Sequence, residues 1–149
     1  MRLALVIVAT LLCQWLSAQE HATGNNAVHF RAVDIYLDTK DKPLAAYQLQ
    51  FWITSGEAKI VGIEGGAHPA FAEPPFYDPK AMQHERVIIA AFNTAPADKL
   101  PKSKTRVATI HLQIIGEQQP GYAIKLETAA TVNGSKVNAQ ATFAERKAK

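Results

Sequence analysis

Five side chains that could bind a metal ion lie in one irregular stretch of the sequence, residues 67–85. They offer the imidazole and carboxylate ligands that suit zinc. They are His68, Glu73, Asp78, His84 and Glu85. Their spacing matches no known ligand pattern, prolines between them scatter their directions, and the sequence has no calcium loop of the DxDxDG type. We therefore predict no metal site, and we expect these residues to be solvated loop residues.

The acidic residues also raise the possibility of hydrolysis by paired carboxylates. A glycosidase needs two carboxyl groups held across a scissile bond in a cleft, and nothing in the sequence fixes any two at that separation. The candidates are Glu57, Glu64, Glu73, Asp78 and Glu85. Nucleophilic catalysis has no better support, because the only cysteine is Cys13 and there is no GxSxG motif or convincing Ser–His pair. We predict that the chain is not an enzyme and needs no cofactor.

Aromatic side chains are the remaining candidates for a binding site, and we select Trp52, Phe76 and Tyr77. Trp52 falls on the opposite side of its predicted strand from Phe51. An outward Trp can stack on a sugar or anchor a protein partner, or it can pack under a loop or against a sheet edge. We expect Phe71 to pin the loop to the domain. For Phe76 and Tyr77 both interpretations stay open.

The stretch that must position these residues is 44–66, which reads as two β-strands joined by a turn. Tyr47, Leu49, Phe51 and Ile53 alternate with polar residues and Trp52, the period of a strand with one buried face. Ser55-Gly56 interrupts the run, and an apolar pattern then resumes up to Gly65-Gly66.

Further strands are predicted on either side of this stretch. Those with an alternating pattern cover residues 29–39, 105–116 and 122–132, whereas 86–94 is nearly all apolar and fits a strand buried on both faces or central in its sheet. Asn133-Gly134 favours a type I′ hairpin turn leading into a return strand at 137–143. Prolines make a continuous strand across 67–85 unlikely, and Asp78-Pro79 predicts one helical turn through Met82. Seven or more strands with little helix indicate an all-β sandwich or barrel.

Residues 1–18 are predicted to be a signal peptide. Arg2 precedes an apolar run of ten residues, which is too short to cross a bilayer, and Ala18 is a small residue at the expected cleavage position. An uncleaved anchor is the alternative. We therefore expect secretion, to the extracellular space or the periplasm, with no stable membrane insertion after cleavage.

The mature chain is then expected to hold one domain, residues 28–144, between a flexible lead-in at 19–27 and a basic tail at 145–149. Arg146, Lys147 and Lys149 are interpreted as a solvated end. Removal of Arg2 leaves 15 basic residues against 13 acidic ones, a net charge of +2. That charge is too small to indicate binding to nucleic acid or to an anionic membrane.

The order of these features resembles a cohesin domain, the module that binds dockerins in cellulosomes. The resembling segments are VDIYLDT, LAAYQLQFWI, KIVGIEGG, a long loop with Phe71, RVIIAAFNT and TRVATIHLQIIG. The resemblance implies a two-sheet jelly-roll sandwich of about seven to nine strands, similar also to some carbohydrate-binding modules. It implies non-catalytic binding of an extracellular, dockerin-like protein, with polysaccharide binding or a structural envelope role without a discrete ligand as alternatives.

Overall fold

The computed structural model describes residues 27–146. The predicted signal peptide, nearly all of the predicted lead-in, and Lys147 and Lys149 lie outside the described residues. Within residues 27–146, no helix is long and apolar enough to cross a membrane.

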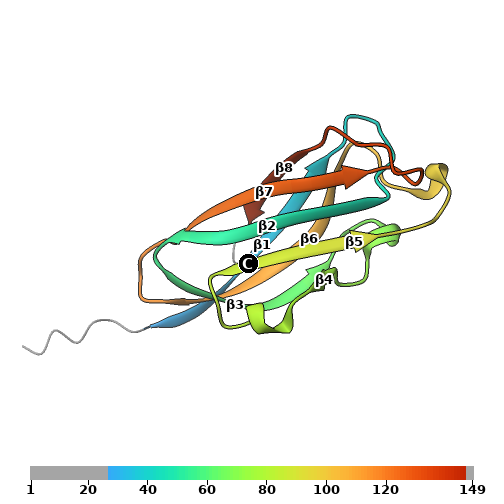
Figure 1. Ribbon diagram of the computed structural model, residues 1–149. Helices are drawn as coiled ribbons and strands as arrows, with labels where there is room; N and C mark the ends of the chain where they lie inside the picture. The colour runs from blue at the N-terminus through green and yellow to red at the C-terminus, as the bar shows by residue number, and fades with distance from the viewer. Residues whose placement is uncertain (1–26, 147–149) are drawn as a thin grey trace, which may run out of the picture.

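Eight strands form two antiparallel four-stranded sheets that pack face to face (Figure 1). One sheet has the order β3-β6-β1-β8, with β1 at Val28–Asp38, β3 at Glu57–Gly65, β6 at Lys104–Ile115 and β8 at Gln140–Glu145. The other has the order β4-β5-β2-β7, with β2 at Ala46–Ser55, β4 at Phe76–Tyr77, β5 at Arg86–Phe92 and β7 at Gly121–Ala130. Three short 3-10 helices complete the described part: η1 at Pro69–Phe71, η2 at Pro79–Ala81 and η3 at Ala97–Lys99. The predicted all-β, two-sheet sandwich is confirmed.

The core lies between the sheets and follows the alternation seen in the sequence. On β2, Tyr47, Leu49 and Phe51 are fully buried while Gln48 is exposed, so one face of the strand meets the other sheet. The Tyr47 hydroxyl crosses the core and donates to the Val107 carbonyl at 3.1 Å. Burial raises the pKa of Tyr47 above its ordinary value, so the hydroxyl stays protonated and remains a donor.

The predicted turn between the two strands of 44–66 carries the chain from one sheet to the other. β2 and β3 do not pair; β2 lies between β5 and β7, and β3 pairs with β6. Gly56 makes the turn with φ of +79°, and a Cβ there would approach the Pro120 Cα to 2.9 Å. Only glycine fits both this backbone conformation and this close approach.

The chain reverses at Asn133-Gly134, as predicted, and Ala130 forms an antiparallel bridge with Lys136, but the turn is not of type I′. Gly134 has a positive φ but Asn133 does not, whereas a type I′ turn needs both. The Gly134 N–H donates to the Thr131 carbonyl, and the Asn133 side chain accepts from the Ser135 N–H. The loop then crosses to the other sheet, where the return strand begins only at Gln140 and pairs with β1.

The strand predicted at 86–94 is central, as one alternative stated, but it is not buried on both faces. β5 lies between β4 and β2, with Val87 and Ile89 buried and Ile88 and Phe92 exposed. No described segment covers its outer side.

The predicted helical turn after Asp78 is confirmed as η2. The Asp78 side chain caps it, because its Oδ1 accepts a hydrogen bond from the Lys80 N–H at 2.9 Å.

Candidate functional site

The outer side of the β4-β5-β2-β7 sheet carries an exposed apolar surface, which we call the β5 face. Its exposed large side chains are Phe76 at 69%, Phe92 at 66% and Ile88 at 45%. Strand register places them together, because Phe76 lies opposite Ala90 and is therefore diagonal to Phe92 on β5. Ile88, Ala90 and Phe92 share one side of β5 by the period of two.

Phe76 and Phe92 form a stacked pair on this face. Their ring centroids are 6.0 Å apart and their planes differ by 12°. Small Ala90 lies between them in the register and leaves room for the contact. The pair stays mostly exposed although the rings touch each other, so it presents flat apolar area to a partner.

Trp52 lies on the same face, as predicted, at the far end of β2. It is half-buried and pairs in register with Arg86, whose guanidinium donates to the Gln50 side chain at 2.7 Å. Gln48 and Gln50 separate Trp52 from the Phe76–Phe92 pair along the sheet and supply polar groups beside it.

Tyr77 takes the opposite direction from Phe76. It pairs with buried Ile89 and packs against the core, so it lies beneath the β5 face rather than on it. Phe71 is buried and meets the Tyr47 ring edge-on at 5.4 Å, which confirms that it pins the loop. The Asn93 amide also holds this loop, through a 2.9 Å hydrogen bond to the Ala70 carbonyl.

The structure adds Ile88 and Phe92, which sequence reasoning missed. The period of two could have placed both on one side of 86–92, but the run is almost wholly apolar and the pattern gave no polar side.

Two hollows lie beyond the β5 face, at the end of the sandwich where the loops 39–45, 93–103 and 131–139 come together (Figure 1). The smaller is about 240 Å³ and is lined by Phe92 and Thr94; the larger is about 570 Å³; both share Thr131 and Val132.

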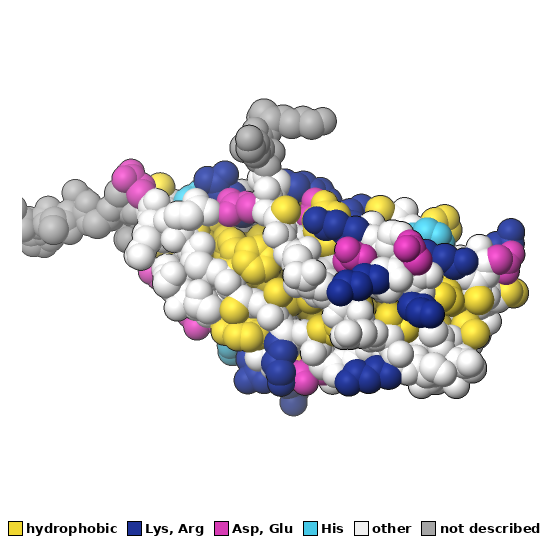
Figure 2. Space-filling model, turned by 90° about the horizontal axis from the view of Figure 1, so that it is seen from above, with side chains coloured by type: hydrophobic (Ala, Val, Ile, Leu, Met, Phe, Trp, Pro, Cys, Tyr) yellow, Lys and Arg dark blue, Asp and Glu magenta, His cyan; other side chains and the backbone are white. Residues whose placement is uncertain are grey.

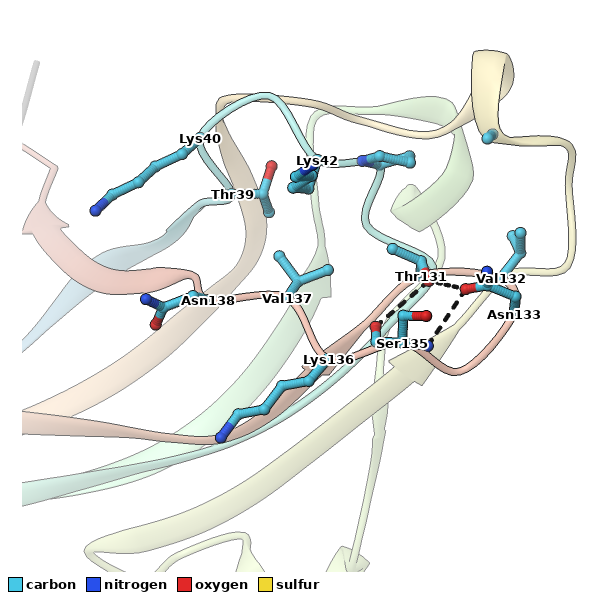
Figure 3. Close-up of a pocket in the computed structure, with 12 residues that line it drawn as sticks. Thr39, Lys40, Lys42, Thr131, Val132, Asn133, Ser135, Lys136, Val137 and Asn138 are labelled. Atoms are coloured by element: carbon cyan, nitrogen blue, oxygen red, sulfur yellow. Dashed lines mark hydrogen bonds between the residues drawn. The ribbon is translucent and has the colours of Figure 1, made fainter.

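The surface around that end is rich in basic side chains. The view from above shows several Lys and Arg side chains there, with apolar and acidic side chains among them (Figure 2). In the larger hollow, residues of the loop 39–45 face residues of the loop 131–139 (Figure 3).

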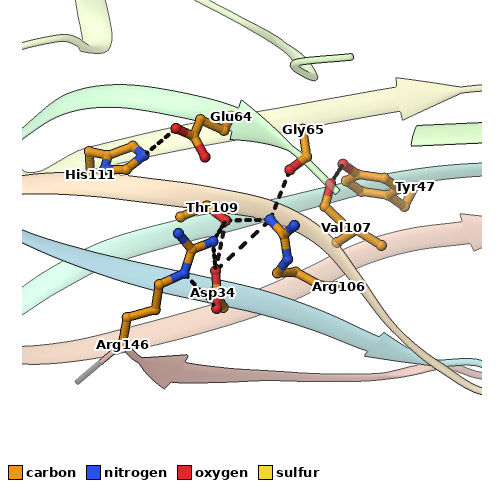
Figure 4. A network of polar contacts seen from close by, with 9 residues as sticks. All are labelled: Asp34, Tyr47, Glu64, Gly65, Arg106, Val107, Thr109, His111 and Arg146. Atoms are coloured by element: carbon orange, nitrogen blue, oxygen red, sulfur yellow. Dashed lines mark hydrogen bonds and ion pairs between the residues drawn. The ribbon is translucent and has the colours of Figure 1, made fainter. Parts of the chain in front are cut away.

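The outer side of the other sheet holds a closed polar network centred on Asp34 (Figure 4). Arg146 donates to both carboxylate oxygens of Asp34, from Nε at 3.0 Å and from Nη2 at 2.8 Å, and the Thr109 hydroxyl donates to Oδ1 at 2.7 Å. Arg106 in turn donates to the Thr109 oxygen at 2.6 Å. Arg146, interpreted as part of a solvated end, is exposed but also forms this ion pair, because it directly follows β8, which pairs with β1.

This network fixes the charge of Asp34. Burial alone would raise the pKa of Asp34, but the hydrogen bonds from Arg146 and Thr109 and the charges of Arg146 and Arg106 outweigh it, and the pKa is lowered. A carboxylate whose two oxygens both accept from donors is held as a structural ion pair and is poorly suited to act as a base.

Two of the five loop residues considered as metal ligands, His68 and Asp78, have a role in local structure. The His68 Nδ1 accepts from the Ala70 N–H at 3.1 Å, and Asp78 caps η2. Among residues 27–146, no three His, Cys, Asp or Glu side chains lie together in a way that could hold a metal ion.

Comparison with known proteins gives no match to a family model, to a curated protein or to a solved structure.

Proposed function

We propose that this chain is a secreted, non-catalytic binding module that holds an extracellular protein partner on the β5 face. The observation that carries the proposal is the exposure of Phe76, Phe92 and Ile88 on one side of one sheet. Large apolar side chains gathered on a surface mark interaction sites. Aromatic residues are enriched in the centres of protein interfaces, and polar groups in their rims.

The arrangement of the face fits a protein partner. An antiparallel sheet gives a broad surface, Phe76, Phe92 and Ile88 form an apolar centre, and Gln48, Gln50 and Arg86 lie beside it. The cohesin resemblance agrees with this assignment, since cohesins bind a protein module, and a dockerin-like partner is the form of the proposal that it implies.

A carbohydrate-binding role is the second candidate. It is favoured by one observation, the near-parallel planes of the Phe76 and Phe92 rings, which differ by 12°. Sugar rings stack on such exposed aromatic surfaces. A capture experiment separates the two candidates, because it shows whether the chain retains a protein or a polysaccharide.

The test is a capture experiment with two matched variants. The immobilised chain is exposed to culture medium and envelope extract, with and without calcium, and to a panel of polysaccharides. A specific protein should be retained, and Phe76→Ser with Phe92→Ser should lose it. The control is Phe30→Ser, because Phe30 is 68% exposed but lies on β1 in the other sheet.

The outcomes decide between the roles. Retention of a protein with a dockerin-like repeat, dependent on calcium, supports the cohesin form of the proposal. Retention of a polysaccharide that is lost in the Phe76/Phe92 variant moves the assignment to sugar binding. A protein that the Phe76/Phe92 variant and the Phe30 variant retain equally excludes the β5 face as its binding site.

A further inference from the structure

We propose that the larger hollow, between the loops 39–43 and 131–138, is a second binding site, and that its ligand is a carboxylate carried on a short aliphatic body. We call this hollow the lysine groove. Its volume of about 570 Å³ lies within the range of small-molecule sites. The proposal does not depend on the β5 face.

Three lysines stand around the groove and no acidic side chain lines it. Among the described residues that line it, Lys40 and Lys42 come from one loop and Lys136 from the other. In Figure 3 the Lys40 and Lys136 side chains extend from the two loops toward the same side of the view. Within residues 27–146, none of the three forms an ion pair shorter than 4.0 Å. An anion in the groove would therefore meet ammonium groups with no competing carboxylate in the lining.

The two acidic residues near Lys40, Asp38 and Asp41, accept hydrogen bonds from groups other than lysine ammonium groups. Asp38 Oδ1 accepts from the Lys40 backbone N–H at 3.0 Å, and Asp41 Oδ1 accepts from the Ser103 hydroxyl at 2.7 Å. The first bond orders the start of the loop, and the second ties the loop to residues 93–103. Within residues 27–146, neither carboxylate lies within 4.0 Å of a lysine ammonium group.

Between these charges, aliphatic side chains share the lining with the uncharged polar residues Thr39, Thr131, Asn133, Ser135 and Asn138. Val137, on the loop 131–138, is buried at 3% exposure and its side chain points toward Thr39 (Figure 3). Pro43 and Val132 also contribute. No aromatic side chain is among the described lining residues, so the groove lacks the stacking surface that sugar rings use. A short aliphatic chain ending in a carboxylate matches both the floor and the rim.

The backbone of the groove is held in an uncommon conformation. Lys40 and Asp41 have φ of 50° and 68°, and the Lys42 N–H donates to the Thr39 carbonyl at 3.2 Å. This is the form of a type I′ turn, which usually contains Asn and Gly. Ser103, which holds Asp41 in place, also has a positive φ of 64°. Strained backbone of this kind gathers at ligand sites, where surrounding contacts maintain it.

Thr39 provides a further, independent observation. It lines the groove and is buried, with 2% of its surface exposed. Its hydroxyl has no hydrogen-bond partner among residues 27–146. A buried hydroxyl in a native fold normally has a partner, and an unpaired one calls for a group that the protein alone does not supply.

The experiment is a titration of the full, nitrogen-15-labelled chain followed by NMR. Hexanoate carries both the charge and the aliphatic body, acetate carries only the charge, and hexanol carries only the body. We expect hexanoate to shift the amides of residues 39–42 and 131–138 and to bind more tightly than acetate or hexanol. The Lys42→Gln/Lys136→Gln variant should bind hexanoate about tenfold or more weakly.

The control removes the same charge from another part of the surface. Lys59 on β3 and Lys80 on η2 are both exposed and do not line the groove. Lys59→Gln/Lys80→Gln should therefore bind hexanoate as the unmodified chain does. Equal loss in both double variants would show only a general charge effect and would overturn the proposal, as would hexanol binding as well as hexanoate.

Two sources could supply this ligand, a free small acid or an acidic side chain of a protein. N-acetyl-leucyl-glutamate amide presents the carboxylate beside an aliphatic side chain on a peptide. Binding of this dipeptide at the strength of hexanoate assigns the groove to a partner's acidic segment; binding of hexanoate alone assigns it to free acids. The Phe76→Ser/Phe92→Ser variant should bind hexanoate normally, so failure at either site leaves the other to be judged separately.

Discussion

Arg146 and Asp34 lie 112 residues apart in the sequence and meet through a two-pronged ion pair on the outer side of the β3-β6-β1-β8 sheet. The Asp34 side chain is nearly buried whereas Arg146 remains partly exposed. The pair therefore closes the end of the chain onto its first strand, and two predictions follow from its geometry.

Arg146→Ala should lower the free energy of unfolding by about 1–2 kcal/mol, because it removes donors from a charged, largely buried acceptor while solvent can replace part of the loss. Urea unfolding monitored by circular dichroism measures the change. Asp34→Ala/Arg146→Ala, compared with the two single variants, gives the coupling between the residues. A coupling close to zero would contradict the role assigned to the pair.

Acid should weaken the fold through Asp34. Its pKa in the folded chain is below the ordinary value of 3.8, so the folded state binds the proton less readily than the unfolded state. The stability from this ionised group is complete above the unfolded pKa and is lost as the pH falls through the lower, folded pKa. Unfolding free energies measured from pH 7 to pH 2 should show that the difference between the unmodified chain and Asp34→Asn narrows only below about pH 4. A difference that stays constant to pH 2 is the contrary result.

Two tyrosines should respond differently to removal of the hydroxyl. Tyr47→Phe loses the hydrogen bond to the Val107 carbonyl and should cost about 1 kcal/mol of unfolding free energy. The Tyr122 hydroxyl is buried without a hydrogen-bond partner among residues 27–146, so Tyr122→Phe should leave stability unchanged or raise it. Thermal or urea unfolding of the two variants side by side checks this, and equal losses would show that the Tyr122 hydroxyl has a partner in solution.

Phenylalanines of the β5 face should matter little to stability. Phe76→Ser/Phe92→Ser removes rings that are mostly exposed, so the loss is limited to their mutual contact and should stay near or below about 1 kcal/mol. Phe51→Ala, in the core, should cost about 3–5 kcal/mol. Melting temperatures of the three proteins give the comparison. A fall for the surface variant as large as that for Phe51→Ala would mean that Phe76 and Phe92 support the fold.

Trp52→Ala tests the other end of the β5 face. Trp52 is half-buried beside Arg86, so the variant should remain folded with a modest fall in melting temperature. If Trp52 is a contact residue, the variant should lose the captured partner. Full retention of that partner would restrict the binding surface to the Phe76–Phe92 end.

The strands were predictable from sequence because their side chains alternate, but the assignment of strands to sheets was not. The run before Ser55-Gly56 shows where β2 ends, yet nothing local indicates that the next strand joins the other sheet. Asn133-Gly134 correctly marked a reversal of the chain, but the two segments that it joins pair only at Ala130 and Lys136. Beyond that bridge, β7 pairs with β2 and β8 with β1, through contacts with distant segments. Tertiary pairing overrides a two-residue signal of this kind.

Prediction of the candidate site was limited in the same way. Alternation placed Trp52 outward correctly, but Phe76 and Tyr77 could not be separated until β4 paired with β5 and set one ring outside and the other inside. Phe92 could not be predicted as a surface residue, because its strand has apolar residues on both sides and the sequence pattern does not show which side is exposed to solvent. The lysine groove joins loops nearly a hundred residues apart, and no sequence motif indicates that meeting.

The pairing of β1 with β8 also governs when this protein can become folded. The first strand finds one of its two neighbours only in residues 140–145, and the ion pair that closes the sheet needs Arg146. A nascent chain therefore cannot complete this sheet until residues 140–146 have been synthesised. Most contacts in the described part of the fold join distant segments, which slows folding. Until β8 has been synthesised, β1 is an edge strand, because the backbone groups of residues 33–38 that pair with β8 have no partner strand.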